Sequence, residues 1–566
     1  MVMSRLPVGR ILRARLDGGF SVGSEASIRV WLTQKHSCYI HNNTVGMSQK
    51  SHRKLADALD RVSAVARKAV VKSAAIGRVD RELLTERGYL QEILKGWYVI
   101  SRRVERRGDS TAWYAVFWDF LSVYFDERFG ADYCLQAGSS IDLHTGANLI
   151  PRQVIALTAR GGKMQLELPH NTSVLVYQDA KNLPREVHVV RGVRAMPLTM
   201  ALCRIPPSFF ENQPLSAEIA LRAVRSVDDL SRAILETESP TLASRFTGAY
   251  RFLGDTERAE QIGKTLRSAG MVFEPENPFV KPAPVFAGGA RLLSAYAGRI
   301  EGLFKTLREP VLEAFRDWPS KRVARPETYL EHVEAVYEHD AYNSLSIEGY
   351  RVTPELIERI RSGRWNPDGD PKDEQAMAAM AAKGYLDAFR MVKKSVARVL
   401  EGASAGRVLR EDYSDWYRAM FSESVRAGLL QPYHLAGHRS ASVYIRASRH
   451  VPPPPEAVND SMDALLDLLD GEQKPIVRAV LGHWLFGFIH PYMDGNGRMA
   501  RFLMNLMMAS GGYPWTIVRT ARRKEYLEAL EAASADQNVA PFAKFIREEM
   551  IVDWTKEPDR RLGRRG

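Results

Sequence analysis

The feature that most constrains the fold is a helical apolar run that stops at a proline and resumes beyond a glycine turn. Residues Val477 to Ile489 are almost entirely apolar, and Pro491 marks the end of the run. The triplet Gly495 to Gly497 then allows a tight turn, after which helical spacing resumes. The sequence therefore predicts two packed helices whose connecting loop turns its backbone amides inward.

Side chains suited to handling phosphate gather in that loop. His490 can accept a proton near neutral pH, and Asp494 is a hard oxygen ligand suited to Mg²⁺. Arg498 and Arg501 are three residues apart, so they share one helix face and suit bidentate contact with phosphate. The free N–H groups of a helix that opens on a glycine turn also face an anion. A plain helix–loop–helix with a capping aspartate is the alternative, and seven specified positions within twelve residues disfavour it.

The loop also resembles a known signature. Residues 490–501 read His-Pro-Tyr-Met-Asp-Gly-Asn-Gly-Arg-Met-Ala-Arg, which resembles the motif of the Fic domain family, with Tyr492 in place of the usual Phe. The resemblance covers about residues 290–550 and implies an all-α core. It also implies transfer of AMP from ATP, with Mg²⁺, to a Ser, Thr or Tyr hydroxyl of a target protein. The roles implied are general base for His490, Mg²⁺ ligand for Asp494, and nucleotide binding for Gly495, Asn496, Gly497, Arg498 and Arg501.

A segment ahead of the loop is similar to the part of Fic proteins that docks the target. Residues Gly437 to Ile445 lead to the proline run 452–455. By resemblance, this is a β-hairpin flap whose open edge pairs with an extended target segment. The docking residues implied are Ser442, Val443, Tyr444 and Ile445. An ordinary hairpin without this role is the alternative.

Residues 344–349, Ser-Leu-Ser-Ile-Glu-Gly, resemble the inhibitory motif of Fic proteins in which an inhibitory helix precedes the signature. Ser344, Glu348 and Gly349 match that motif, and Gly349 suits a helix C-terminus. The resemblance implies an ion pair between Glu348 and Arg501 that withholds the guanidinium from the γ-phosphate. A surface glutamate at a helix end is the alternative.

Other activities remain open within the same family. Some Fic relatives transfer UMP, phosphocholine or phosphate, and in some members the same glutamate positions water for removal of AMP. The run Asn496-Gly497-Arg498 keeps the pattern associated with AMP transfer.

The chain has 566 residues, enough for two to four domains. We expect a mainly α protein in which a winged helix and a small α/β domain precede the all-α core. The expected divisions are a poorly structured segment (1–46), a winged-helix-like domain (47–110), a small α/β and helical region with a linker (111–285), the Fic domain with its inhibitory helix (286–550) and a basic tail (551–566).

The basic charge is concentrated at the N-terminus. Residues 1–110 contain 21 Lys and Arg against 10 Asp and Glu, so their net charge of +11 nearly equals the +12 of the whole chain. Helical spacing from Ser51, a strand candidate at 94–100 and arginines at 102, 103, 106 and 107 resemble the winged-helix start of abortive-infection type antitoxins. DNA binding through residues 47–110 is therefore one hypothesis, with the Fic domain acting as a sensor; a solvated basic surface is the alternative.

Cys38, Cys134 and Cys203 are widely separated, which argues against a disulfide framework or a zinc site and favours a reducing compartment. No apolar stretch is long enough to span a bilayer. These features predict a cytoplasmic protein with no membrane association. A homo-oligomer and a start at Met47 instead of Met1 are both left open by the sequence.

Overall fold

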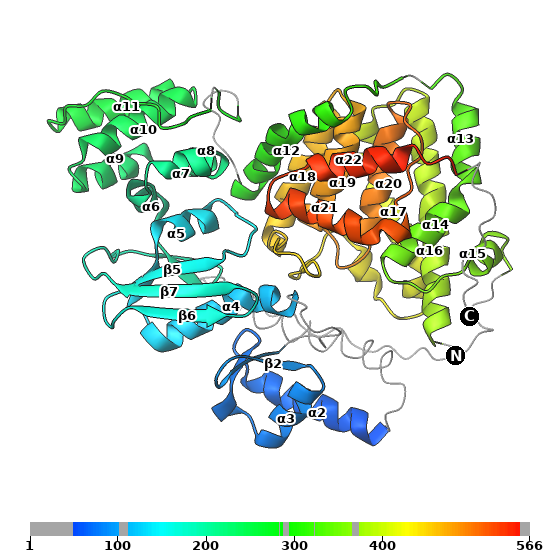
Figure 1. Cartoon of the computed structure of the whole chain (residues 1–566), viewed down its shortest axis with the longest axis horizontal. Coiled ribbons are helices and arrows are strands. Elements are labelled where there is room, and N and C mark those ends of the chain that lie inside the picture. The colour runs from blue at the N-terminus through cyan, green and yellow to red at the C-terminus, as the bar shows by residue number, and fades with distance from the viewer. Residues whose placement is uncertain are drawn as a thin grey trace, which may run out of the picture.

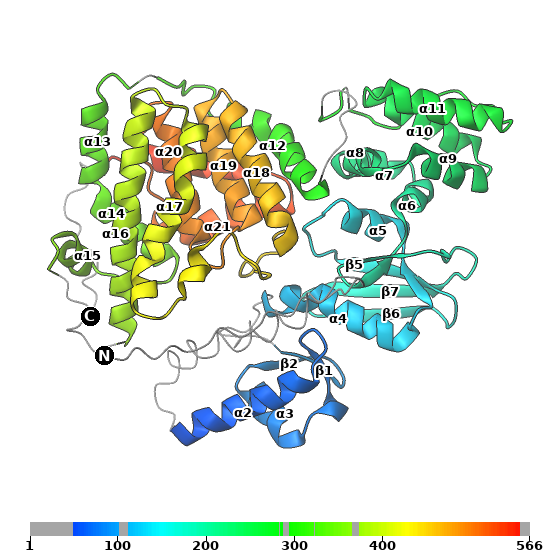
Figure 2. The same ribbon diagram turned by 180° about the vertical axis from the view of Figure 1, so that it is seen from behind.

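A computed structural model describes residues 49–100, 111–281, 283–286, 294–321, 323–364 and 373–554. Figures 1 and 2 show a large C-terminal helical domain beside a column of smaller units formed by the N-terminal half. The expectations for residues 1–46, for the start at Met47, for the arginines at 102–107 and for the tail from 555 onward lie outside the described residues.

The first described unit alternates helices and short strands. Its elements are α2 (Gln49–Val65), β1 (Val70–Lys72), α3 (Arg78–Glu86), β2 (Leu90–Leu94) and β3 (Trp97–Ile100). The strands form an antiparallel sheet in the order β1-β3-β2. The expected order is helix, turn, helix and a strand pair, whereas here the short strand β1 lies between the two helices.

Two further details of this unit differ from the sequence expectation. Residues 94–100 do not form a single strand, because the chain reverses at Gly96, which has φ +80°, to pair β2 with β3. The helical spacing from Ser51 also places Leu55, Leu59, Val62 and Val65 on one face of α2; the first three are buried, but Val65, the last residue of the helix, is 48% exposed.

An α/β unit follows. It contains α4 (Thr111–Phe129), β4 (Tyr133–Leu135), α5 (Ala137–His144), β5 (Gln153–Thr158), β6 (Met164–Leu168), β7 (Thr172–Gln178), β8 (His188–Val190) and β9 (Val193–Ala195). Four strands form one sheet in the order β4-β5-β7-β6, in which β5 and β7 are parallel, and β8 pairs with β9 separately. The aromatic side chains of α4 fill the core under this sheet, with Trp113, Phe117 and Phe120 completely buried.

Six helices then form a compact bundle. They are α6 (Leu198–Arg204), α7 (Ser208–Asn212), α8 (Pro214–Ala223), α9 (Val227–Glu236), α10 (Pro240–Phe252) and α11 (Thr256–Ser268). The linker expected within 111–285 packs on this bundle in residues 275–281. Phe279 is buried against Phe252 and Phe210, and the main chain of Glu276 lies over Gly248, where a Cβ would meet its carbonyl oxygen at 2.0 Å.

The C-terminal domain is built from helices with one continuous apolar core. They are α12 (Ala295–Ala314), α13 (Pro326–Ala335), α14 (Tyr337–Ile347), α15 (Pro354–Arg361), α16 (Asp373–Leu400), α17 (Ala405–Arg426), α18 (Val458–Gly471), α19 (Pro475–Ile489), α20 (Asn496–Ala509), α21 (Arg523–Ala535) and α22 (Ala540–Met550). Helices α19 and α20 pack against each other at its centre, with α17, α18, α21 and α22 around them (Figure 1). These two are the helices predicted on either side of the glycine turn.

The β-hairpin flap expected from Gly437 to Ile445, ahead of the proline run, is not formed by paired strands. The chain reverses at Ala447, which has φ +57°, and the N–H of Ser448 donates a turn bond to Ile445 O at 3.2 Å. Its outgoing arm pairs elsewhere, through a bridge between His450 and Leu149 of the α/β unit. The two arms therefore do not pair with each other as strands.

None of the helices in the described ranges combines the length and the apolarity that crossing a bilayer requires.

A buried ion pair fixes the chain where it leaves the helical bundle. Glu218 and Arg222 on α8 are 3% and 2% exposed and lie 3.0 Å apart. The Glu218 carboxylate also accepts the N–H groups of Val285 and Phe286, and Arg222 donates to the carbonyl of Phe286. Residues 285–286 are thus held by a charged pair that water does not reach.

We predict that Glu218→Ala lowers the free energy of unfolding by about 3 kcal/mol, because it leaves the Arg222 cation buried without its anion. Chemical denaturation measures this change. Glu211→Ala, at an exposed position on the neighbouring helix α7, is the control and should change stability by less than about 0.5 kcal/mol. Equal effects of the two substitutions would contradict the role given to the buried pair.

Candidate active site

The site begins where α19 ends. His490 is the residue that terminates this helix, in the left-handed conformation with φ 53° and ψ 58°, and its N–H still bonds to Phe486 O at 2.9 Å. Left-handed backbone is strained for a residue with a side chain, so the surrounding structure has to hold it. The conformation turns the chain away from α19 just before Pro491. His490 therefore lies at the corner between helix and loop.

The loop is held by the side chain of Asn496. Its Oδ1 accepts the N–H of Tyr492 at 2.9 Å and its Nδ2 donates to the carbonyl of Tyr492 at 2.8 Å. Both ends of the amide are thus used inside the loop, and the side chain is 2% exposed. Of the groups of Asn496 that were expected to contact phosphate, only the backbone N–H is therefore left to do so.

Helix α20 opens at this loop with its first N–H groups facing outward. Gly495 precedes the helix with φ +82°, a conformation that glycine adopts without strain, and a Cβ there would meet the Phe421 ring at 2.8 Å. The N–H groups of a helix's first turn have no partner within the helix, and its dipole adds partial positive charge. The turn is therefore a preformed anion site.

Arg498 is buried beneath that turn. Its side chain is 1% exposed, and its guanidinium lies 5.3 Å from the Tyr350 ring and 5.1 Å from the Phe421 ring. Asp494 Oδ2 approaches Nη2 at 3.5 Å, but Nε and Nη2 form no hydrogen bond within the described structure. A buried guanidinium with open N–H groups is suited to receive a further anion.

Asp494 lies at the mouth of the loop, with its side chain 62% exposed. Its Oδ1 accepts the N–H of Gly495 at 2.6 Å. The N–H of Gly495 thus orients the carboxylate, and the rest of the carboxylate is exposed to solvent.

Arg501, one turn further along α20, is bound by the end of α14. Its Nε donates to Ser344 Oγ at 2.7 Å, and its Nη2 donates to Ser344 O at 3.1 Å and to Glu348 Oε1 at 2.7 Å. The Arg501 side chain is 4% exposed and that of Glu348 is 27% exposed. Burial acts to lower the pKa of Arg501, but the carboxylate of Glu348 outweighs it and the pKa is raised. The structure therefore contains the ion pair implied by the resemblance.

Glu348 is aimed by the way α14 ends. The N–H of Gly349, which has φ +93°, bonds to Ser346 O at 3.0 Å, and the N–H of Tyr350 bonds to Leu345 O at 3.1 Å. These two bonds are the Schellman arrangement that closes a helix at a glycine. Glu348 is the last residue before this turn, so its position depends on Gly349.

The Glu348 carboxylate lies directly over the first turn of α20. A Cβ added to Gly497 would be 2.3 Å from Glu348 Oε1. Only glycine at 497 leaves room for the carboxylate in this place. The anion site at the start of α20 is thus overlaid by an anion of the protein itself.

The imidazole of His490 is prepared to accept a proton. Its Nδ1 lies 3.2 Å from the carbonyl of Gly487, which assigns the proton to Nδ1 and leaves Nε2 as the acceptor. Its pKa is lowered to about 4, chiefly by burial and also by Arg439, whereas the Gly487 carbonyl, Glu348 and Asp494 act against the shift. The ring is therefore neutral at physiological pH.

One residue of the site was given no role from the sequence. Arg439, 5% exposed, donates from Nε to His490 O at 2.8 Å and from Nη1 to Ala441 O at 3.0 Å, and its own N–H bonds to Pro491 O. It joins the catalytic loop to the segment expected to dock the target. An arginine in an irregular loop has no spacing pattern, so the sequence contains no signal for this contact.

Known proteins match this chain in the same region. Residues 409–508 match the Fic/DOC family. The chain is 28% identical over 232 residues to the protein adenylyltransferase Fic of Nematostella vectensis, covering 40% of this chain and 48% of that protein. It is also 28% identical over 229 residues to the protein adenylyltransferase Fic of Drosophila grimshawi, covering 40% and 42%. The match thus spans less than half the length of these relatives.

Residues 409–508 form a Fic domain. Solved structures similar to this chain include Fic-1 (residues 134–508) of C. elegans, with a TM-score of 0.33, 17% identity and coverage of 62% of this chain and 88% of that one. Another is a Fic domain containing signaling protein of Bacteroides thetaiotaomicron, with a TM-score of 0.31, 18% identity and coverage of 44% and 93%. Glu348 lies ahead of the matched stretch and reaches the Fic loop only through the fold.

The predicted docking residues lie beside the Fic loop. Ser442 is exposed, Val443 is 9% exposed, and Tyr444 and Ile445 are half-buried. Through Arg439 the segment is fixed to the main chain at His490 and Pro491.

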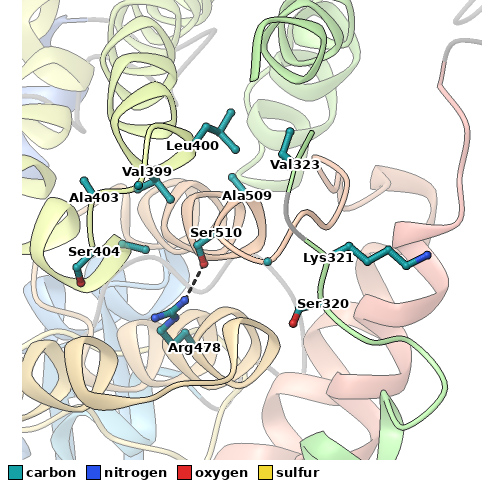
Figure 3. Close-up of a pocket in the computed structure, with 13 residues that line it drawn as sticks. Ser320, Lys321, Val323, Val399, Leu400, Ala403, Ser404, Arg478, Ala509 and Ser510 are labelled. Atoms are coloured by element: carbon teal, nitrogen blue, oxygen red, sulfur yellow. Dashed lines mark hydrogen bonds between the residues drawn. The ribbon is translucent and has the colours of Figure 1, made fainter. Parts of the chain in front are cut away.

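A cavity of about 350 Å³ lies at the other end of α20, about 20 Å along the helix from the Fic loop. It is bounded by the loop at Lys321, the end of α16 and the residues Ala509 to Gly511. Figure 3 shows Lys321 pointing away from the Arg478–Ser510 hydrogen bond, which is 2.8 Å long. The lining of this cavity contains neither His490 nor a residue of the glycine turn.

We predict that the His490 ring protonates only as the pH falls through about 4, because burial disfavours the charged imidazole. The histidine Cε1 signal that disappears in His490→Ala identifies the residue in an NMR titration of the native protein. A midpoint near the ordinary value of about 6.5 would show that the ring is solvated, contrary to this structure.

Proposed function

We propose that this chain is a protein adenylyltransferase that moves AMP from ATP to a Ser, Thr or Tyr hydroxyl of a target protein. The observation that carries the proposal is the buried Arg498, whose open N–H groups lie under a helix N-terminus beside a neutral histidine. The relatives named protein adenylyltransferase Fic support the same reaction.

In the proposed reaction, His490 Nε2 takes the proton of the target hydroxyl as that oxygen bonds to the α-phosphorus. The bond from this phosphorus to the bridging oxygen breaks, and pyrophosphate leaves. The hydrogen bond from Nδ1 to Gly487 O stabilises the positive charge that develops on the ring. Catalysis here is chiefly positioning and electrostatic stabilisation.

The phosphates are proposed to bind the N–H groups of residues 495–497, Arg498 and Arg501. Asp494 would hold Mg²⁺. One exposed carboxylate fits a Mg²⁺ ion that keeps most of its waters and shares phosphate oxygens. Within the described residues no group of three or more His, Cys, Asp and Glu side chains could form a metal site made by the protein alone. When bound, the ion would neutralise charge on the phosphates.

Glu348 is proposed to inhibit this reaction, with Ser344 and Gly349 supporting it. The carboxylate binds Arg501 and overlies Gly497, where the terminal phosphate would contact the helix. An ATP molecule has to displace it or bind in an unproductive position. The resting site is therefore closed to productive ATP.

The target is proposed to dock in extended form along residues Ser442 to Ile445. The site permits other transferred groups, including UMP, and removal of AMP; mass spectrometry of the modified protein distinguishes them.

The free thiols of Cys134 and Cys203 accord with a cytoplasmic location.

We predict that Glu348→Gly raises AMP transfer at least tenfold and that His490→Ala, alone or with Glu348→Gly, abolishes it. Incorporation of labelled AMP in lysate of the source organism measures both. Glu338→Gly, on the same helix but paired with Arg361 outside the site, is the control and should behave as the wild type. Wild-type activity in Glu348→Gly would contradict the inhibitory role.

A second candidate function is DNA binding by the first unit. The element order β1-β3-β2 with α2 and α3, together with the basic excess of residues 1–110, favours it. Among the described residues, α3 gives it little support, since Arg78 is paired with Glu82 on that helix.

We predict that duplex DNA binding, if the first unit has this function, weakens steeply with salt and is lost when Arg102, Arg103, Arg106 and Arg107 are replaced by Gln. Fluorescence anisotropy between about 50 and 200 mM salt measures it. Absence of binding by the wild type at the lower salt would exclude this function.

A further inference from the structure

The end of α14 contacts both of the arginines that are proposed to bind the phosphates. Glu348 pairs with Arg501, and two residues later the ring centroid of Tyr350 lies 5.3 Å from the Arg498 guanidinium. Arg498 and Arg501 are three residues apart and share one face of α20. The turn that aims Glu348 therefore also brings an aromatic ring onto the other guanidinium.

The backbone of Tyr350 is fixed by the same turn. Its N–H donates to Leu345 O at 3.1 Å, and Gly349 has the left-handed conformation, φ +93°, that closes a helix in this way. The ring is half-buried and packs against the core of the C-terminal domain. Burial raises the pKa of Tyr350, and Arg498 acts against this rise, as expected for a phenol beside a cation. The ring thus reaches Arg498 from a fixed backbone.

A second ring approaches the same guanidinium from α17. The ring centroid of Phe421 lies 5.1 Å from it, and the Arg498 side chain is 1% exposed. The attraction between an aromatic face and a cation is strongest where water is excluded. Such a contact compensates the buried charge without using the N–H groups. Nε and Nη2 of Arg498 form no hydrogen bond within the described structure, so they remain available to a further anion.

Asp494 lies close enough to compete for these N–H groups. Its Oδ2 is 3.5 Å from Arg498 Nη2, whereas a hydrogen bond between a guanidinium and a carboxylate is usually about 2.8 Å long. A small movement of the guanidinium would close this pair. A closed pair would occupy the donor that is proposed for the phosphates and the carboxylate that is proposed for Mg²⁺. Between the two rings, Arg498 stops short of it.

We propose that Tyr350 is a positioning residue that, together with Phe421, holds the Arg498 guanidinium ready for the phosphates of the nucleotide. This inference rests on the proposed function, which assigns Arg498 to the phosphates. It also means that the end of α14 has to stay in place during the reaction, although it carries the inhibitory carboxylate. The Glu348 side chain is 27% exposed, so it can leave Arg501 by turning into solvent while the Tyr350 ring stays on Arg498.

The test separates the ring of Tyr350 from the rest of its side chain. In a Glu348→Gly background, Tyr350→Leu removes the ring and Tyr350→Phe keeps it. Tyr342→Leu, a half-buried position on a different face of α14 from Ser344, is the matched control. Isothermal titration calorimetry measures the binding of ATP with Mg²⁺ and of tripolyphosphate, a probe without a nucleoside.

We expect both probes to bind about tenfold more weakly to Tyr350→Leu than to Glu348→Gly alone, because the desolvated contact with the cation is lost. Tyr350→Phe and Tyr342→Leu should each stay within about twofold of Glu348→Gly alone. Tyr350→Met, which also lacks the ring, takes the place of Tyr350→Leu if that variant does not fold, with the same expected loss.

Unchanged binding of ATP in Tyr350→Leu would overturn the inference and leave the proposed function standing. A loss in Tyr350→Phe as large as that in Tyr350→Leu would overturn it too, because the effect would then belong to the hydroxyl. If Glu348→Gly alone binds ATP but transfers no AMP, the proposed reaction is wrong and the binding comparison still decides the role of Tyr350. If Glu348→Gly alone binds neither probe, the phosphate site and the inference built on it both fail.

Discussion

The site depends on two guanidinium groups buried at the start of one helix. Burying a cation costs several kcal/mol unless an anion or hydrogen bonds compensate it. Arg501 is compensated by Ser344 and Glu348, whereas Arg498 has two aromatic faces, a distant Asp494 and open N–H groups. The first turn of α20 thus needs anions, and the protein supplies only part of them. In the proposed function, a polyphosphate completes the set and competes with Glu348.

That requirement explains several local choices of residue. Gly497 leaves room for either the carboxylate or a phosphate against the helix. Gly349 closes α14 so that Glu348 points at the turn. Asn496 uses both ends of its amide to hold the loop, which frees the backbone N–H groups for a ligand. His490 has a strained left-handed backbone at the corner of the loop and a lowered pKa. Both leave its Nε2 available as a proton acceptor.

The sequence predicted most where short-range spacing determines geometry. The loop between α19 and α20, the shared face of Arg498 and Arg501, and the glycine end of α14 all follow from helical periodicity and glycine chemistry. The sequence did not predict contacts between residues that are far apart in the chain. The outgoing arm of the expected hairpin, for example, pairs with Leu149, some 300 residues away, instead of with its own partner arm. Arg439 was missed for the same reason, since its carbonyl partners come together only in the fold.

Helix α21 contacts both the end of α14, which carries Glu348, and the residues that follow the segment proposed to dock the target. At its first residue, Arg523 donates from Nε to Ile347 O at 2.7 Å, next to Glu348, and toward its end Glu531 holds Ser448 and Arg449. A helix is stiff over this length, so displacement of the α14 terminus and displacement of the docking segment act on the same body.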